Sequence, residues 1–365
     1  MSISCSRRLA EASARLAAFL FAVALLGVVV PVTTTPQPNN AGRLADRQFL
    51  VRTPQGSGFA RYFGTASLDG DPTATRALIV IHGVLRDADY YFDTGVIAAA
   101  AAHALAQTFV IAPQFVERSE LAGHRVSPNT LYWNDEWPGG SDAVAPAPIS
   151  TYDVFDAIIA RLSDKTRFPK MREIVVAGHS AGGQIVQRYA VVGKAPQLDR
   201  GARVPIHLVV SNPSSYLYFT DWRPFPQPGC TDFDRWRYGL IGAPRYVAGT
   251  APELEARYVG RRVTYLMGTA DTNPNESDLD RTCGGEAQGP YRFARAKYFI
   301  GYFGRRHPGG TNQDYAFVRG VPHDNRRMFT SSCGLSAIFG GSLAACAASG
   351  PVRGDLRFTD PGANR

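Results

Sequence analysis

The sequence predicts an α/β protein whose central sheet is mostly parallel and is covered by helices on both faces. Short, continuous runs of apolar and β-branched residues recur along the chain, and segments with helical periodicity separate them. Such runs are typical of strands buried on both faces, and their alternation with helices favours a parallel sheet. One run also ends in a Gly-x-Ser-x-Gly turn that passes into a helical pattern. The expected strands are 77–81, 109–112, 174–177, 206–211, 263–267 and 315–318, and the expected helices include 149–162 and 291–303.

The N-terminal residues 1–41 have the order of a secretory signal. Arginines precede an uninterrupted apolar stretch, 16–32, which runs into a polar, proline-rich segment. We expect a cleaved signal peptide and export to the periplasm or the medium. An uncleaved N-terminal membrane anchor stays open as the alternative, because the apolar stretch is just long enough to span a bilayer. In that case the membrane contact would be made through this segment alone.

Residues 42–365 are expected to form one domain, because they contain no repeat and no long low-complexity linker. The chain has 365 residues and is 45% hydrophobic, which is ample for a large core. The range 220–258 has a mixed secondary-structure pattern. It is interpreted as an insertion over the sheet edge with a cap-like or lid-like role. The net charge is +8, but the basic residues are scattered, so we expect no nucleic-acid partner.

The loop after the first expected strand contains His82, Gly83 and Val84. Backbone N–H groups there can face the turn that follows strand 174–177. The N–H of Val84 is the preferred donor to a substrate oxyanion, with Gly83 as the second choice. His82 is expected to orient this loop rather than to act as a base.

The turn Gly178-His179-Ser180-Ala181-Gly182 has the pattern of a nucleophile elbow. Gly178 and Gly182 lack a Cβ, so strand and helix can approach closely on either side of the serine. Ser180 is then exposed at a helix N-terminus as the candidate nucleophile. The N–H of Ala181 is a free donor of the new helix and the other candidate for the oxyanion hole.

A carboxylate is expected just after strand 263–267, at the carboxyl edge where such sheets place their chemistry. Asp271 is the preferred candidate, and Asp278 and Asp280 are its rivals. The acidic residues around Glu276 match no cation-binding loop, so no metal is expected.

A serine hydroxyl needs a base, and His323 after strand 315–318 is the candidate. His307 lies in a basic loop that is expected at the surface. His207 lies inside an expected strand and is expected in the core. The order serine, aspartate, histidine along the chain fits a triad on a doubly wound sheet.

Four cysteines follow the export segment: Cys230, Cys283, Cys333 and Cys346. An even number in an exported chain predicts two disulfides, and three pairings are possible. We expect Cys230–Cys283 and Cys333–Cys346; free buried thiols stay open as the alternative.

Together these motifs resemble the α/β-hydrolase superfamily over residues 75–330. The resemblance implies an eight-stranded, mainly parallel sheet, a triad of Ser180, Asp271 and His323, and no cofactor. Val84 follows Gly83 where one lipase branch has further glycines. The export segment and the glycine-rich elbow are similar to those of secreted esterases and polyester depolymerases.

The expected activity is hydrolysis of a small or polymeric carboxylic ester through an acyl-enzyme. A secreted serine peptidase or amidase, and a polyester depolymerase, would use the same triad and stay open. A non-catalytic binding module on the same scaffold is a further alternative.

Overall fold

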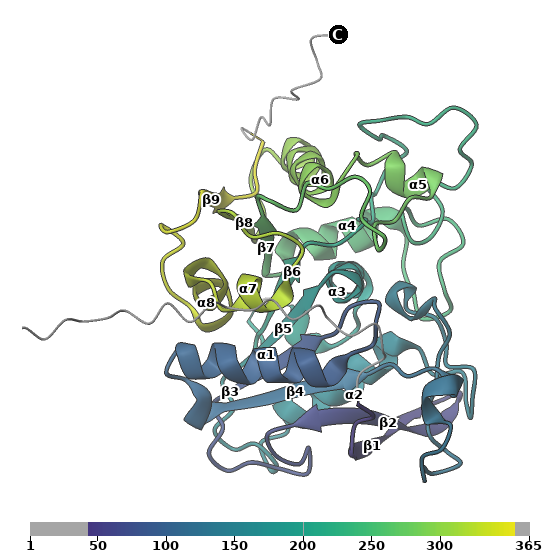
Figure 1. Ribbon diagram of the computed structural model, residues 1–365, viewed down its shortest axis with the longest axis vertical. Coiled ribbons are helices and arrows are strands. Elements are labelled where there is room, and N and C mark those ends of the chain that lie inside the picture. The colour runs from purple at the N-terminus through teal and green to yellow at the C-terminus, as the bar shows by residue number, and fades with distance from the viewer. Residues whose placement is uncertain (1–42, 200, 355–365) are drawn as a thin grey trace, which may run out of the picture. The chain divides into compact units, whose positions relative to one another are not determined.

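A computed structural model describes residues 43–199 and 201–354 (Figure 1). The signal peptide or anchor expected at residues 1–41 lies outside the described residues. Among the described helices, none combines the length and the apolar character that crossing a bilayer requires.

A mostly parallel sheet forms the centre of the fold, as the sequence predicts. Within the described residues it has nine strands in the order β1-β2-β4-β3-β5-β6-β7-β8-β9. The six strands from β4 to β8 in this order are parallel, and β2 and β9 pair with them antiparallel at the two sides. The strands are β1 (Arg47–Thr53), β2 (Gly56–Gly64), β3 (Arg76–Ile81), β4 (Thr108–Gln114), β5 (Glu173–His179), β6 (Ile206–Ser211), β7 (Val263–Gly268), β8 (Gln313–Val318) and β9 (Ala348–Pro351).

All six expected strands are present at β3, β4, β5, β6, β7 and β8. The resemblance implied eight strands, and the short β9 brings the described sheet to nine. Strands β1 and β2 form a hairpin that the sequence did not reveal.

The parallel strands are buried on both faces. In β3, Ala77, Ile79 and Ile81 belong to one hydrophobic cluster, and Leu78 and Val80 belong to another on the opposite face. Successive side chains of a strand point to opposite faces, so burial of both faces requires an uninterrupted apolar run. This is why the sequence shows continuous runs here and no alternation.

Two sets of helices cover the sheet. Residues of α1, α7 and α8 pack in the cluster that contains Leu78, and these three helices lie together in Figure 1. Residues of α2, α3, α4 and α6 pack in the cluster that contains Ile79. The helices are α1 (Ala88–Ala101), α2 (Thr151–Ser163), α3 (Ala181–Val192), α4 (Ala251–Gly260), α5 (Cys283–Glu286), α6 (Arg292–Arg306), α7 (Asn325–Phe329) and α8 (Ser332–Phe339).

Helices α2 and α6 correspond to the expected helices 149–162 and 291–303. Helix α2 begins two residues later than expected, because Ser150 caps it. The Ser150 hydroxyl accepts from the backbone N–H of Tyr152, and Asp153 accepts from the backbone N–H of Ser150.

The range 220–258 was assigned to an insertion, but α4 begins inside it. Leu254 and Tyr258 of α4 are buried in the core, so this helix covers the sheet. The stretch without a helix or strand of its own is 212–250, which we call the 212–250 segment. A lid role for it stays a prediction.

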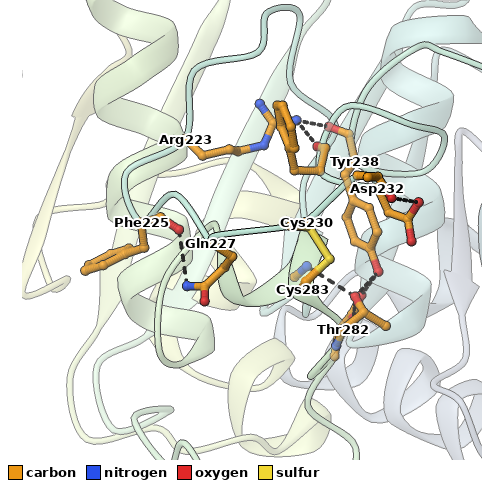
Figure 2. The surroundings of a disulfide bond; sticks show 12 residues. Arg223, Phe225, Gln227, Cys230, Asp232, Tyr238, Thr282 and Cys283 are labelled. Atoms are coloured by element: carbon orange, nitrogen blue, oxygen red, sulfur yellow. Dashed lines mark hydrogen bonds between the residues drawn. A yellow bond between two sulfur atoms is a disulfide. The ribbon is translucent and has the colours of Figure 1, made fainter.

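Several bonds hold the 212–250 segment in place. The disulfide Cys230–Cys283 joins it to α5, as expected (Figure 2). The Tyr238 hydroxyl lies 2.5 Å from the Thr282 hydroxyl, next to that disulfide (Figure 2). The buried Arg223 side chain donates to the carbonyl oxygen of Tyr238 at 3.0 Å. The segment is therefore tied internally and to its neighbour by covalent and polar contacts.

The second disulfide, Cys333–Cys346, confirms the other expected pairing. It joins α8 to the chain that leads into β9. Two disulfides are typical of proteins that fold in an oxidising compartment.

Candidate active site

The turn between β5 and α3 has the backbone of a nucleophile elbow. Ser180 has φ 60° and ψ −124°, a backbone conformation that residues other than glycine rarely adopt. Its N–H donates to the carbonyl oxygen of Ser211 at 3.1 Å, which fixes the turn against β6. Strain of this kind is maintained where the surrounding structure holds it, and it is concentrated at functional sites.

Two glycines make this turn possible. A Cβ on Gly178 would lie 2.1 Å from the carbonyl oxygen of Gly182, and a Cβ on Gly182 would lie 2.2 Å from that of Ile81. Both obstacles are backbone atoms, which cannot move aside as a side chain can. The elbow therefore packs directly on the end of β3, as the motif predicts.

Asp271 and His323 meet at the carboxyl edge of the sheet. Asp271 Oδ2 lies 2.8 Å from His323 Nδ1. Their two loops are joined by a hydrogen bond from the Ala270 N–H to the Val321 carbonyl oxygen, at 3.1 Å. The structure thus brings together the two residues that the sequence selected for the acid and the base.

The rival candidates are engaged elsewhere. Asp280 accepts from the Tyr238 hydroxyl at 2.8 Å. His307 contacts Glu255 at 3.0 Å, and His207 contacts Thr264 at 2.9 Å inside the sheet. Asp278, the other rival of Asp271, is exposed.

Asn212 is a positioning residue that the sequence reasoning missed. It follows β6, is 1% exposed and has φ 41°. Its Oδ1 accepts from the N–H of Gly268 at 2.9 Å, and its Nδ2 donates to the carbonyl oxygen of Pro322 at 3.4 Å. It therefore links the aspartate loop to the histidine loop. The available signal was its place directly after an expected strand.

Asp271 lies in a buried, polar environment. It is 3% exposed, and its Oδ1 lies 3.7 Å from Arg292 Nη1. The same Arg292 nitrogen lies 2.7 Å from Glu276 Oε2. Burial raises the pKa of the Asp271 carboxyl, and the Arg292 charge opposes that rise.

The surroundings of His323 favour the neutral form of its ring. Burial, followed by the charge of Arg292, lowers its pKa well below the ordinary histidine value. A neutral ring whose Nδ1 faces Asp271 can carry its proton on Nδ1, which leaves Nε2 free to accept one. This is the protonation state that a general base needs.

His179, included in the elbow motif without a role, packs on His323. The two ring centroids are 4.5 Å apart. His179 Nδ1 lies 3.3 Å from the Tyr91 hydroxyl, and burial lowers the pKa of the His179 ring well below its ordinary value. A second neutral ring therefore supports the candidate base from the side of the elbow.

His82 orients the loop after β3, as expected. The Phe115 N–H donates to His82 Nε2 at 3.1 Å, so the proton of the ring lies on Nδ1. That Nδ1–H donates to the carbonyl oxygen of Gly83 at 2.8 Å. Burial lowers the pKa of His82 to about 3, so the ring stays neutral and does not act as a base at neutral pH.

This contact also sets the direction of the next amide. A carbonyl and the N–H that follows it point in opposite directions across a trans peptide, so the Val84 N–H points away from His82. A Cβ on Gly83 would lie 3.8 Å from the Ser180 Cβ, which places this loop beside the elbow. Among the described residues, neither the Val84 N–H nor the Ala181 N–H has a hydrogen-bond acceptor.

Arg86 holds the same loop, and sequence reasoning did not find it. It has φ 59°, and its N–H donates to the carbonyl oxygen of Gly83 at 3.2 Å. Its guanidinium lies 2.9 Å from Glu117 and 3.0 Å from Glu120. These ion pairs keep the loop after β3 in a strained conformation next to the serine.

The described part of the chain contains no hydrogen bond between the Ser180 hydroxyl and the His323 ring. Hydrogen bonds between catalytic groups are often long in ligand-free structures and shorten only when substrate binds. Asp271 and His323 are thus directly joined, and Ser180 lies next to His179, which packs on His323.

Comparisons with known proteins identify the fold. No protein-family model matches the chain, and no curated protein sequence matches it. Among solved structures, it is similar to poly(aspartic acid) hydrolase-1 from Sphingomonas sp. KT-1, with a TM-score of 0.54 and 23% identity over 82% of this chain and 99% of that one. It is also similar to a poly(3-hydroxybutyrate) depolymerase from Bordetella parapertussis, with a TM-score of 0.54 and 21% identity over 81% of this chain and 90% of that one.

The chain has the α/β-hydrolase fold. In an α/β-hydrolase fold the nucleophile, the acid and the histidine follow one another along the chain at the carboxyl ends of strands. Ser180, Asp271 and His323 follow β5, β7 and β8 in this order.

Proposed function

We propose that this protein hydrolyses carboxylic esters through an acyl-enzyme on Ser180. The observation that carries the proposal is the 2.8 Å contact between Asp271 and His323 beside a strained serine elbow. A serine hydroxyl needs a base, and the base needs a carboxylate that fixes its tautomer. The proposal is supported by the positions of these three residues, which follow β5, β7 and β8 at the edge that the carboxyl ends of parallel strands share.

The proposed reaction has two halves. The Ser180 Oγ attacks the ester carbonyl carbon while His323 Nε2 takes the hydroxyl proton. The tetrahedral intermediate collapses, the bond to the alcohol oxygen breaks, and His323 returns the proton to the leaving alcohol. Water then attacks the acyl-enzyme in the same way and releases the acid and Ser180.

The oxyanion of each intermediate would be bound by the N–H groups of Ala181 and Val84. Both amides lie beside the elbow and lack an acceptor among the described residues. One such donor contributes about 3 kcal/mol in the transition state. Gly83 permits the close approach of this loop to the serine, and its own N–H stays the less favoured alternative.

The reaction should fail in acid with a midpoint below pH 6.5, the ordinary histidine value. Only the neutral His323 ring can accept the serine proton, so the rate falls as the pH drops through its pKa. Burial and the Arg292 charge lower that pKa, which moves the loss of activity to lower pH. The check is kcat/KM for a neutral p-nitrophenyl ester between pH 4 and 9; a midpoint above pH 6.5 would contradict this account.

A polymeric ester is the second candidate substrate. One of the two similar structures is named for poly(3-hydroxybutyrate), a polyester, and the other for poly(aspartic acid), whose residues are joined by amide bonds. A serine peptidase or amidase would use the same three residues, because acyl transfer from an amide needs the same base and oxyanion donors.

A substrate panel separates these candidates. We expect p-nitrophenyl esters to be cleaved with a kcat/KM at least about a hundredfold above that for peptide p-nitroanilides, since alcohols are better leaving groups than amines and a dedicated amidase must compensate for the difference. Anilides cleaved as fast as esters would overturn the ester assignment in favour of the peptidase. Release of soluble acid from poly(3-hydroxybutyrate) granules would extend the assignment to polymers.

We also propose that the protein is exported. The two disulfides favour an oxidising compartment, and the order of basic and apolar residues in 1–41 is that of a secretory signal. Mass spectrometry of the mature N-terminus distinguishes a cleaved signal from a retained anchor.

A further inference from the structure

Three fully buried arginines converge on the loop after β6. Arg188 on α3 is 0% exposed, and Arg292 and Arg295 on α6 are 1% and 0% exposed. Arg188 donates to the Ser215 hydroxyl at 3.1 Å, and Arg292 donates to the Ser214 hydroxyl at 2.9 Å. Arg295 donates to the Ser214 carbonyl oxygen. This loop follows Ser211, whose carbonyl oxygen accepts from the Ser180 N–H, so the arginines contact a loop that begins next to the serine turn.

Carboxylates do not balance this positive charge. Arg292 pairs with Glu276 at 2.7 Å and lies 3.7 Å from Asp271. In the described part of the chain, neither Arg188 nor Arg295 has a carboxylate within salt-bridge distance. Buried charges without a counter-ion are costly, which makes an uncompensated one a candidate for function.

The carboxylates of this region lie beside Arg292 and Arg237. A fourth guanidinium, that of Arg237, lies 3.8 Å from Asp280. It also lies 3.8 Å from Glu136, so Arg237 has two carboxylates of its own, whereas Arg188 and Arg295 have none within salt-bridge distance among the described residues. The Nη2 atoms of Arg292 and Arg295 are buried and have no hydrogen-bond partner among the described residues.

Gln184 connects the buried Arg188 to the helical turn that begins at Ser180. Its N–H donates to the Ser180 carbonyl oxygen at 3.0 Å, so it lies in the first turn behind the nucleophile. Its side chain is held by its oxygen, because Oε1 accepts from Arg188 Nη2 at 3.3 Å and from the Ser215 hydroxyl at 2.9 Å. Arginine has only donors, so the oxygen must face it and the amide nitrogen must point away.

The Gln184 amide nitrogen is the accessible end of this arrangement. Gln184 is 8% exposed and Ser180 is 6% exposed, whereas Gln187 and Arg188 in the next turn are 0% exposed. Among the described residues the Gln184 nitrogen has no acceptor. A polarised donor, backed by a buried cation, is therefore left in the helical turn that follows the nucleophile.

We propose that the ester substrate carries a carboxylate, which Gln184 Nε2 binds in the field of the buried arginines. This inference rests on the proposed ester hydrolysis and names the substrate class of the same site. Gln184 supplies the hydrogen bond, and Arg188 holds its amide and supplies the charge. A neutral acceptor on the substrate would use the hydrogen bond but would gain nothing from the charge.

The test compares two esters that differ at one terminal group: mono-4-nitrophenyl adipate and 4-nitrophenyl hexanoate. The measured quantity is the ratio of their kcat/KM values at pH 7.5. In Gln184→Glu the new carboxylate pairs with Arg188 and repels an anionic acyl chain. We expect the ratio of adipate to hexanoate to fall on the order of tenfold or more, the size of one charge interaction at about 10 Å.

Gln107→Glu is the matched control, because it changes the net charge of the protein by the same amount. Gln107 is exposed and lies just before β4, at the edge of the sheet opposite the candidate active site. Its ratio should equal that of the wild type. An equal ratio in Gln184→Glu and wild type would overturn the inference and leave ester hydrolysis in place. Turnover of neither ester by folded wild-type protein would overturn the proposed function, and the inference with it.

A second measurement on the wild-type protein covers the case in which Gln184→Glu does not fold. Adipate and the neutral, similarly shaped adipamide are compared as competitive inhibitors of hexanoate ester hydrolysis. We expect the inhibition constant of adipate to be about tenfold lower. Equal constants for the two compounds would overturn the inference.

Discussion

Ser180→Ala is expected to lower kcat for p-nitrophenyl esters by about a million-fold. The hydroxyl is the only group of the protein that forms a bond to the acyl carbon in the proposed reaction, so no acyl-enzyme can form without it. The oxyanion donors and the binding of the ester persist, which leaves a residual rate about a thousandfold above that in water. Labelling by a fluorophosphonate probe should disappear together with turnover.

The fold should tolerate this substitution. Ser180 has φ 60°, and alanine meets the same steric restriction there as serine, so the thermal midpoint should change little. Ser163→Ala is the control, because Ser163 ends α2, in the connection through which the chain enters β5 at the opposite edge of the sheet. A kcat of Ser180→Ala within tenfold of the wild-type value would contradict the assignment of Ser180 as the nucleophile.

The sequence predicts the parallel strands well because burial on both faces gives an uninterrupted apolar run. Strand β1 (Arg47–Thr53) was not predicted by this criterion, because its residues alternate between buried and more exposed positions at the side of the sheet. Strand β9 (Ala348–Pro351) contains no β-branched residue, and all four of its residues are at least partly exposed. Its pairing with β8 is set by tertiary contacts, which a local pattern does not encode.

The three candidate catalytic residues were found because their position follows from topology. Each comes directly after or shortly after an apolar strand, and the carboxyl ends of parallel strands share one edge. Arg86 and Asn212 were missed for the opposite reason. Their roles arise from contacts between loops that are distant in sequence, such as the contacts of Asn212 with Gly268 and Pro322.

The buried arginines show the same limit. Arg292 was expected only as part of a helix, and nothing in its surroundings in the sequence marks it as a neighbour of Asp271. A scattered set of basic residues is normally solvated surface. Only the folded chain shows that Arg188, Arg292 and Arg295 are buried together against the loop that follows β6.

Asp271→Asn is expected to lower kcat by about ten thousand-fold. The carboxylate accepts from His323 Nδ1, which keeps the proton there and leaves Nε2 free as the base. An amide in its place can donate to Nδ1, and that would favour the tautomer with its proton on Nε2. The ring could then not take the serine proton, although its position would be unchanged. The check is kcat for a p-nitrophenyl ester on the pH plateau.

The stability of this variant should change in the opposite direction to its activity. Burial raises the pKa of Asp271, so the folded protein binds its proton more tightly than the unfolded chain does. The stability linked to this group is therefore present at low pH and is lost as the pH rises through the folded pKa. At pH 7 a neutral asparagine avoids that cost, and we expect an unchanged or higher thermal midpoint.

Asp278→Asn makes the same chemical change at an exposed position seven residues along the same loop region. It should leave kcat within about twofold of the wild type, because surface substitutions away from the site have small effects. A wild-type rate in Asp271→Asn, or a loss of similar size in Asp278→Asn, would contradict the assignment of the acid. A loss confined to Asp271→Asn without a fall in thermal stability would mean that this carboxylate is retained for the reaction at some expense of the fold.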